Sequence, residues 1–411
     1  MSELSYLEKL LDGAEVEWVA LNKLATFLKG KSLPKEKITP DGNRYCIHYG
    51  ELFTHYGPII DKVCSKTNQA INESILSEKN DVLMPTSDVT PRGLATASCI
   101  QESGVILGGD ILIIRCSGVD GRYLSNFIIN NKKKILQMVK GSTVYHLYAK
   151  DIGKLLIPIP CPNNPEKSLA IQSEIVRILD KFTALTAELT AELNMRKKQY
   201  NYYRDQLLSF DEEQEKPIYL EKLLDGVEVE WLPLSDLARI RNGKDHKSLS
   251  EGEFPVYGSG GIMRYVDTYA YNKPSVLIPR KGSLGNLFFI DVPFWTVDTI
   301  FYTEIDEAQI RPKYLYYFLS TVGLGEMNQA GGVPSQTQSV LNKLKIPIPC
   351  PDNPEKSLAI QSEIVRILDK FDTLTNSITE GLPREIELRQ KQYEYYRDLL
   401  FSFPKSETVS N

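Results

Sequence analysis

The chain lacks most of the sequence features that mark membrane proteins, disulfide-bonded proteins and common enzymes. No run approaches the roughly 20 apolar residues that a membrane helix needs, and no signal peptide opens the sequence. The six cysteines form no CxxC pair and only four histidines are present, so neither a disulfide framework nor a zinc site is expected. These absences favour a cytoplasmic protein with reduced cysteines and no membrane contact.

Motifs for catalysis are missing as well. The sequence contains no GxxxxGK(S/T) phosphate loop, no GxSxG nucleophile turn and no HExxH metal pair. Residues 352–356, DNPEK, faintly resemble the acidic and lysine residues of a nuclease, but a second occurrence of this run has Asn163 in place of Asp352. The spacing suits a helix cap better. The glycines of 258–261 lack the following lysine of a phosphate loop. We therefore predict no catalytic residue and no metal site.

What the chain does contain is an internal duplication. Residues 157–186 (IPIPCPNNPEKSLAIQSEIVRILDKFTALT) recur at 346–375, 189 positions later, with three differences. Residues 6–25 (YLEKLLDGAEVEWVALNKLA) recur with more changes at 219–238, 213 positions later. The order is leading repeat, variable block and repeated helix, followed by the same three parts again. Because one duplicated framework carries two unlike inserts, we expect two half-molecules with a shared fold.

The repeated stretch predicts a long helix that begins between Asn164 and Ser168 and extends to Phe210. Its apolar positions alternate spacings of four and three, which is the pattern of a coiled-coil seam. We expect the seams of the two copies to pack on each other as an antiparallel pair; two separate core helices are the alternative. The predicted seam residues, which would form the spacer and subunit interface, are Ile171, Ile175, Ile178, Phe182, Leu185, Leu189, Ile360, Ile364, Ile367, Phe371, Leu374 and Ile378.

The two helices differ where the first copy contains the tandem TAELTAEL, residues 186–193. The second copy reads NSITEGLPREIEL in this region, is four residues longer, and contains Gly381 and Pro383. Four residues add about one helical turn, or about 6 Å. We expect the glycine and the proline to kink or break the second helix at this place.

The variable blocks, residues 26–156 and 239–345, have the pattern of mixed α and β structure. Strands are expected within 82–85, 104–115, 275–280 and 286–290, and helices near 123–138 and 314–321. The first block has 17 Lys and Arg against 12 Asp and Glu, and the second 12 against 10, although the whole chain has a net charge of −5. Two mildly basic blocks are compatible with phosphate contacts, but many domains with neutral partners have a similar balance.

Polar and aromatic residues gather at predicted turns of both blocks. Arginine can form two parallel hydrogen bonds with a guanine edge, whereas Ser, Thr and Tyr commonly hold phosphates. A solvated turn or a tyrosine at a strand edge is the alternative for each residue taken singly. The candidate DNA-binding residues are Tyr49, Thr54, His55, Tyr56, Thr86, Ser87 and Arg92 in the first block, and Tyr257, Ser259, Arg264, Tyr265, Arg280 and Lys281, with Asp298 beside them, in the second.

Over essentially its whole length the chain resembles the specificity subunits of type I restriction–modification systems. The resemblance rests on the IPIP…EKSLAIQSEIVRILDKF strand-to-helix pattern, the TAEL tandem and the tail QYNYYRDQLLSF; the last two resemble the IC subclass. YGSGGIMRYVDTY, VLIPRKGSLGNLFFI and PFWTVDT together resemble a target-recognition-domain pattern, and IHYGELFTHYG resembles another.

The resemblance implies an α+β fold class. Two mixed α/β target recognition domains would be joined by two long antiparallel helices, a coiled-coil spacer, in a pseudo-twofold arrangement that is circular in space. The domains would comprise a leading repeat and first recognition domain (1–156), a central spacer helix (157–210), an acidic joint with the second leading repeat and second recognition domain (211–345), and a C-terminal spacer helix and tail (346–411).

The resemblance also implies a function. Each domain would recognise one half of an asymmetric, bipartite site in double-stranded DNA, and the resemblance implies a gap of about six base pairs for two TAEL copies. Each tetrapeptide would tune this gap, because one helical turn corresponds to about one or two base-pair steps. The chain would be non-catalytic. Its helices would dock two methyltransferase subunits, and two restriction–translocase subunits would join. S-adenosylmethionine, ATP and Mg²⁺ would bind to those partners, with no cofactor in this chain.

Two other classes of function remain open on the residues alone. An autonomous enzyme would need a pocket of titratable groups that the sequence does not assemble. A protein–protein scaffold that binds no DNA would share the helices but would not require two unlike, basic inserts.

Overall fold

The computed structural model describes residues 6–210, 222–224, 226–328 and 332–404. The chain divides into two compact units: unit 1 contains Met1–Glu188 and Glu387–Asn411, and unit 2 contains Leu189–Ile386. The dividing points fall inside two helices, so each long helix contributes to both units. The predicted acidic joint that starts at residue 211 lies largely outside the described residues.

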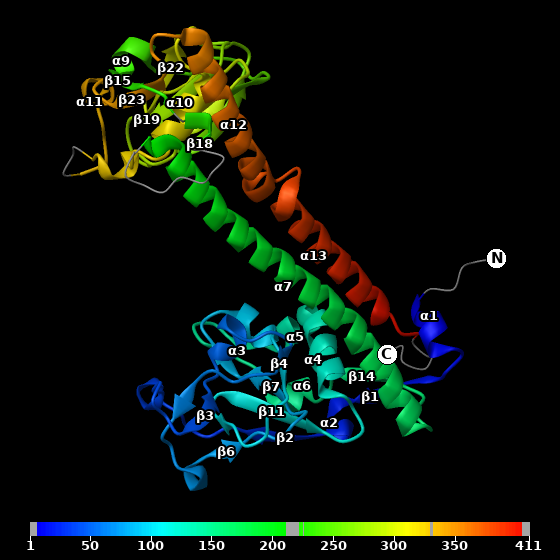
Figure 1. The fold of residues 1–411 in the computed structure, drawn as a ribbon. Helices are drawn as coiled ribbons and strands as arrows, with labels where there is room; N and C mark the ends of the chain where they lie inside the picture. Colours follow the sequence, from blue (N-terminus) through cyan, green and yellow to red (C-terminus); the bar gives the residue numbers. More distant parts are fainter. Residues whose placement is uncertain (1–5, 211–221, 225, 329–331, 405–411) are drawn as a thin grey trace. The chain divides into compact units, whose positions relative to one another are not determined.

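Unit 1 is built on a five-stranded sheet (Figure 1, blue to cyan). Its strand order is β2 (Ala25–Lys29), β11 (Ile111–Cys116), β7 (Val82–Pro85), β9 (Ser98–Ile100) and β4 (Ile59–Ile60). The smaller sheets contain β5 (Lys66–Thr67), β3 (Arg44–Ile47), β10 (Ile106–Leu107) and β6 (Ile75–Leu76); β12 (Lys140–Gly141), β13 (Tyr145–His146) and β8 (Ser87–Asp88); and the pair β1 (Val16–Ala20) and β14 (Leu156–Pro160).

The helices of unit 1 cover this sheet and join it to the long helix. They are α1 (Tyr6–Leu11), α2 (Leu21–Leu24), α3 (Glu51–Thr54), α4 (Gly121–Asn130), α5 (Lys132–Met138), α6 (Ala149–Ile152), the start of α7 (Pro165–Ser209) and the end of α13 (Gly381–Leu400), with 3-10 turns η1 (Lys35–Lys37), η2 (Ile71–Glu73) and η3 (Pro91–Ala95). One core contains apolar residues of α1, the β2–β11–β7 sheet, α4, the start of α7 and the tail at Leu400–Phe403. Both ends of the chain therefore contribute to one unit.

Unit 2 is built on a four-stranded sheet with the order β16 (Ala238–Asn242), β22 (Ile300–Ile305), β19 (Ser275–Pro279) and β20 (Phe288–Ile290). Beside it lie the sheet β18 (Gly261–Val266), β17 (Phe254–Gly258) and β21 (Trp295–Thr296), and the pair β15 (Val229–Pro233) and β23 (Lys345–Pro349). Its helices are α9 (Leu234–Leu237), α10 (Pro312–Leu319), α11 (Gln338–Leu341) and α12 (Pro354–Asn376), the 3-10 turn η4 (Leu324–Glu326), and parts of α7 and α13.

The two variable blocks share a framework, as the sequence predicts. The order β2–β11–β7 in unit 1 corresponds to β16–β22–β19 in unit 2, with antiparallel pairing throughout. The helix that follows places a buried tyrosine in the same contact: the hydroxyl of Tyr123 donates to the carbonyl of Pro158 at 2.8 Å, and that of Tyr314 to Pro347 at 2.8 Å. Two blocks of different sequence therefore end at the repeated helix in the same way.

The repeated stretch begins its helix where predicted. Asn164 and Asn353 each accept a hydrogen bond from the backbone N–H three residues on, at 3.0 Å in both copies. About two turns later, the buried Gln172 accepts from the N–H of Asp120 at 2.9 Å, and its repeat counterpart Gln361 accepts from that of Arg311 at 2.8 Å. The helix starts are identical because each forms the same hydrogen bond to the start of a helix in its own variable block.

The predicted seam is used in two different ways. Ile171, Ile175, Ile360 and Ile364 are buried in the cores of their own units, which combine apolar residues of the recognition block with the tail of the other long helix. Ile178 and Ile367 lie at the edges of the same cores. In the first two turns, the apolar residues of each helix pack into the core of its own unit. The spacing of apolar residues alone does not distinguish this packing from a coiled coil.

Further along, each helix meets the other copy through its tail. The ring of Phe182 stacks on Tyr396 in unit 1, with centroids 5.2 Å apart and planes at 25°. In unit 2 the ring of Phe371 stacks on Tyr203, at 5.4 Å and 27°. These pairs are repeat counterparts of each other. These stacks are contacts between a seam and a tail, and the packing of the two identical seams on each other is not confirmed.

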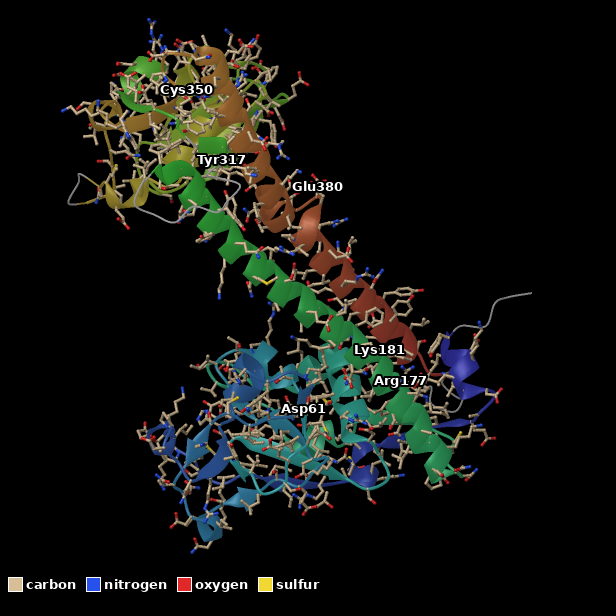
Figure 2. The ribbon with its side chains drawn as sticks, viewed as in Figure 1. Asp61, Arg177, Lys181, Tyr317, Cys350 and Glu380 are labelled. Carbon is tan, nitrogen blue, oxygen red and sulfur yellow. The ribbon has the colours of Figure 1, made fainter. Side chains whose placement is uncertain are left out.

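The second helical arm is broken, as its glycine and proline predict. Helix α12 ends at Asn376 and α13 starts at Gly381, whereas α7 runs without interruption through the TAEL tandem. Gly381 has φ +80°, and a Cβ there would lie 2.3 Å from the carbonyl oxygen of Thr373, so only glycine fits. Ile378 falls in this break and is 79% exposed, so its assignment to the seam was wrong. Figure 2 labels Glu380 at the same place.

Two predicted elements are each divided in the structure. The strand expected across 104–115 is two strands, β10 and β11, because Gly108 and Gly109 turn the chain between them. The helix expected near 123–138 is α4 and α5, separated at Asn131, whose side chain donates to the carbonyl of Phe127 at 2.9 Å and ends the first helix. Both breaks have local causes, glycines in one case and a side-chain hydrogen bond to the backbone in the other, which the periodicity of apolar residues does not show.

Candidate nucleic-acid interface

The described residues contain no group of three or more His, Cys, Asp or Glu side chains placed to hold a metal ion. Within the same part of the chain, no helix is long and apolar enough to cross a membrane. The DNPEK run begins α12, with Asn353 as its cap, and forms no acidic cluster. The six cysteines are free thiols, and burial raises the pKa of Cys46 and of Cys99 to about 12.

The strongest feature of the candidate site is that one pair of residues from each predicted set occupies the same place in the fold. Thr86 follows β7 and Arg280 follows β19, each directly after a proline. The N–H of Thr86 donates to the carbonyl of Asp110 at 2.8 Å, and that of Arg280 to the carbonyl of Thr299 at 2.8 Å. Their backbone positions are the same, although one side chain is a short hydroxyl and the other a long guanidinium.

The backbone carbonyls at these positions match as well. The carbonyl of Thr86 accepts from the N–H of Leu147 at 3.0 Å, and that of Arg280 from Gln336 at 3.0 Å. The next residues are again equivalent, because Ser87 pairs with His146 and Lys281 with Ser335 in antiparallel bridges. Thr86–Ser87 and Arg280–Lys281 are therefore the same two positions of one scaffold with different chemistry.

In unit 2 three further segments surround Arg280 and Lys281. The N–H of Ser259, in the turn between β17 and β18, donates to the hydroxyl of Thr299 at 3.3 Å. The side-chain amide of Asn286 donates to the carbonyl of Ser259 at 3.2 Å. Together these contacts bring a turn, a strand end and a loop into one exposed polar group.

No carboxylate of this group occupies the N–H donors of Arg280, so they remain available to a ligand. Lys281 lies 3.7 Å from Asp298, an exposed and weak pair. The guanidinium of the half-buried Arg280 lies 5.9 Å from the ring centroid of Phe301 and has no carboxylate partner among the described residues. An arginine held by its flat face on a ring keeps its edge donors for a planar partner such as a base.

Other candidates of unit 2 lie outside this group. Tyr257 is only 9% exposed and belongs to a small core with Leu277 and Phe294, so its proposed DNA contact is not supported: β17 is buried on both faces. Arg264 donates to the carbonyl of Leu249 at 3.1 Å, and Tyr265 is 48% exposed further along β18.

In unit 1 the remaining candidates lie on α3 and η3. Thr54 and His55 are exposed at the end of α3, with the His55 ring set edge-on to Tyr56 at 4.8 Å. Tyr56 is half-buried; burial raises its pKa to about 12, and its hydroxyl accepts from the N–H of Cys64 at 3.2 Å. Tyr49 is half-buried against the adjacent core. Tyr49 and Tyr56 thus stabilise the segment around α3, and their half-buried rings are less accessible to a ligand than Thr54 and His55.

Segment η3 lies next to α3. A Cβ added to Gly93 would come within 3.4 Å of the Phe53 ring, which shows how closely the two segments approach. Arg92 is exposed on η3 and has no ion-pair partner among the described residues. The candidates from 49–56 and from 86–92 are therefore brought to neighbouring segments, although they are far apart in sequence.

Several residues of this surface were missed from the sequence. Asn286 and Thr299 organise the Ser259 turn, and Ile262 and Met263 beside it are 50% and 59% exposed. A sequence signal for the alignment of the two domains was present in VLMPTS (82–87) and VLIPRK (276–281). Read together, these runs indicate that Thr86–Ser87 and Arg280–Lys281 are one pair of positions.

Comparison with known proteins gives a consistent result. The family described as type I restriction modification DNA specificity domain matches residues 14–196 and 226–388. The specificity subunit of the Escherichia coli type I restriction enzyme EcoR124I/EcoR124II is 39% identical, covering 100% of both chains. The EcoprrI specificity subunit, also from E. coli, is 34% identical over 92% of this chain and 93% of its own length.

Solved structures show the same fold. The S subunit of a type I restriction–modification system from M. genitalium superposes with a TM-score of 0.60 at 20% identity, covering 96% of this chain and 98% of its own. A chain from a study of complex assembly in the type I R-M system superposes with a TM-score of 0.55 at 15% identity, over 94% and 97%. At these identities the likeness concerns the fold alone.

Proposed function

The chain belongs to the family of type I restriction–modification specificity subunits, and on that premise we propose that unit 1 and unit 2 each recognise one half of a bipartite DNA site. As a specificity subunit the chain confers DNA sequence specificity on its complex and is itself non-catalytic. A protein–protein scaffold that binds no DNA is not favoured, because both matched segments are DNA specificity domains.

The observation that carries the proposal is the pair of equivalent positions with unlike side chains. Arg280 and Lys281 offer donors to base edges and phosphates, whereas Thr86 and Ser87 offer only short hydroxyls. Since the backbone around each pair makes the same hydrogen bonds, a change of side chain there alters recognition without altering the fold. Two unlike readers on one framework predict an asymmetric site with two different halves.

We further propose that the helices act as a spacer in a pseudo-twofold, circular arrangement. The reciprocal stacks of Phe182 on Tyr396 and Phe371 on Tyr203 support it, because a twofold axis would generate one from the other. The packing of Leu7 and Leu11 in one core with Phe401 and Phe403 supports the closure of the chain on itself. The tandem would set a gap of about six base pairs, at one or two base-pair steps per helical turn.

The partners follow from the family and are part of the proposal. The exposed helix faces would dock two methyltransferase subunits, and two restriction–translocase subunits would complete a cytoplasmic complex. S-adenosylmethionine, ATP and Mg²⁺ would bind to those subunits. A methyltransferase subunit modifies a base only after extruding it from the duplex, so this chain's contribution is to place the duplex and not to react with it.

Selection from a pool of random duplexes tests the proposal. The chain is mixed with its methyltransferase partner, and the bound duplexes are sequenced. We expect enrichment of two unlike half-sites at a constant separation. Enrichment of no split motif, with both proteins folded and associated, would contradict it. The methyltransferase partner alone is the control, and should select nothing.

A further inference from the structure

The two unlike variable blocks share an exposed lysine at one equivalent position. The first long strand of each block is followed by glycine and lysine: Gly30–Lys31 after β2 and Gly243–Lys244 after β16. Lys31 and Lys244 are both exposed, and neither has an ion-pair partner among the described residues. Other exposed residues that the units share, such as Glu17 and Glu230, lie in the nearly identical repeats and not in the variable blocks.

The glycine explains how each lysine is positioned. A Cβ on Gly30 would lie 2.0 Å from the carbonyl oxygen of Gly108, and one on Gly243 would lie 2.0 Å from that of Val297. Only glycine allows this approach, so the following residue is bound closely to the neighbouring strand. The N–H of Lys31 donates to the carbonyl of Leu107 at 3.2 Å, and that of Lys244 to Thr296 at 2.8 Å.

These lysines border the candidate reading positions in both units. The segment beneath Lys31 leads from Gly108 to Asp110, whose carbonyl holds Thr86. In unit 2 the segment beneath Lys244 leads from Val297 to Thr299, whose carbonyl holds Arg280. Each unit therefore presents a variable pair of side chains and, beside it, an invariant unpaired ammonium group.

From this contrast we infer that Lys31 and Lys244 are a matched pair of sequence-independent contacts to DNA backbone phosphates, one in each unit. The inference rests on the proposed DNA recognition and goes beyond it by separating the two kinds of contact. If the halves of the site differ, a residue that is identical in both units cannot distinguish their bases. A phosphate is the same at every base pair, and an unpaired lysine is a suitable partner for it.

Each lysine lies near one further lysine and one carboxylate. Lys31, Lys37 and Glu73 line one open cleft of about 400 Å³. The loop between Lys31 and Lys37 is held in place because Gln69 donates to the carbonyl of Ser32 at 3.1 Å and Thr67 to that of Lys37 at 2.8 Å. In unit 2 Lys244 is followed by Asp245 and Lys247, and the backbone N–H of Lys247 lowers the pKa of Asp245. Both settings keep one positive charge in excess, so we expect the two contacts to depend on salt to a similar extent.

Salt dependence of binding tests the inference. The full chain with its methyltransferase partner is titrated with duplex between 50 and 200 mM salt. The slope of log K against log salt is negative, and each lost phosphate contact reduces its magnitude by about 0.9. We expect Lys31→Gln and Lys244→Gln each to reduce this magnitude by about 0.9 and the double variant by about 1.8, with selected bases unchanged. Lys133→Gln, an exposed lysine on α5, is the matched control and should leave the slope unaltered.

The outcomes separate this inference from the proposed function. An unaltered slope in both variants, an equal drop in the Lys133 control, or a changed half-site in either variant would overturn the lysine assignment. Lys31→Arg should retain the slope, because charge is what the contact requires. If the wild-type complex selected no split motif, the proposed recognition would fail, whereas slopes measured on any duplex would still decide the phosphate contact.

Discussion

The two units differ most where their backbones agree most closely. The backbones of Thr86 and Arg280 each make two matching hydrogen bonds, of 2.8 and 3.0 Å, yet the side chains share neither size nor charge. Around the repeated helix the reverse holds, because identical side chains such as Gln172 and Gln361 accept from the backbone of two unlike helices. The protein thus keeps constant the residues that dock a domain and varies the residues that the domain presents to a ligand.

A second contrast concerns one repeated carboxylate. In unit 2, Asp369 accepts from the hydroxyl of Tyr317 at 2.6 Å and pairs with Lys313 at 2.8 Å; Figure 2 labels Tyr317 at this contact beside α12. In unit 1, burial raises the pKa of its counterpart Asp180. Asn126 occupies the position of Tyr317 and accepts instead from Tyr393 at 3.4 Å. The repeated aspartate therefore stabilises the variable block as Asp369 in unit 2, whereas burial of Asp180 lowers the stability of unit 1.

The largest expected effect is a loss of stability when the glutamine that each repeated helix buries is removed. Gln172→Ala and Gln361→Ala each leave a buried N–H without its acceptor and remove a bond to Ser168 or Ser357. We expect each to reduce the free energy of unfolding by about 2–4 kcal/mol. Denaturant titration of the full chain measures it. Loss in only one variant would mean that the two docking contacts are not equivalent.

The repeated aspartate should behave oppositely in the two units. Asp369→Ala removes the acceptor of Tyr317 and should cost about 1–3 kcal/mol, seen as faster amide hydrogen exchange in α10. Asp180→Asn should instead stabilise unit 1 at pH 7. Because the folded-state pKa of Asp180 is raised, the native state binds the proton more readily than the unfolded chain, and its stability falls as pH rises through the window above the unfolded value. Below pH of about 3 the Asn variant should match the wild type. Equal losses in both variants would remove the contrast.

Loss of base discrimination by unit 2 should leave base discrimination by unit 1 unchanged. Arg280→Ala is expected to relax base preference in the second half-site by about 1–3 kcal/mol per contacted base pair, with the first half-site unchanged. Competition between duplexes with single base changes measures it. Lys133→Gln, which also removes one exposed positive charge but lies in unit 1 on α5, serves as the control. Uniform weakening on all duplexes would recast Arg280 as a phosphate contact.

The smallest change concerns the gap. Deletion of one TAEL copy, residues 190–193, removes about one turn from α7 and should shorten the preferred separation by one or two base pairs with both half-sites retained. The selected duplexes report separation and half-sites together. Altered half-sites would show that the helix does not act as a spacer.

Much of this fold follows from the sequence because the duplication is explicit. The helix start follows from Asn164, which has a counterpart in the second copy, and the broken second arm from Gly381, which has none in the first. The use of the seam did not follow, since apolar spacing shows that Ile171 and Ile175 are buried but not against what. Tyr257 was misassigned for a similar reason: a tyrosine beside a glycine turn has the same sequence context whether its ring points inward or outward.

The equivalence of Thr86–Ser87 with Arg280–Lys281 is the most direct claim to test. Sequencing of methylated sites in cells that express the chain with its methyltransferase partner gives both half-sites at once. The wild type should methylate an asymmetric, split sequence. Substitution of Thr86 and Ser87 by alanine should alter the first half alone, and substitution of Arg280 and Lys281 the second alone. A change in both halves from either pair, or in neither half from both pairs, would contradict the account.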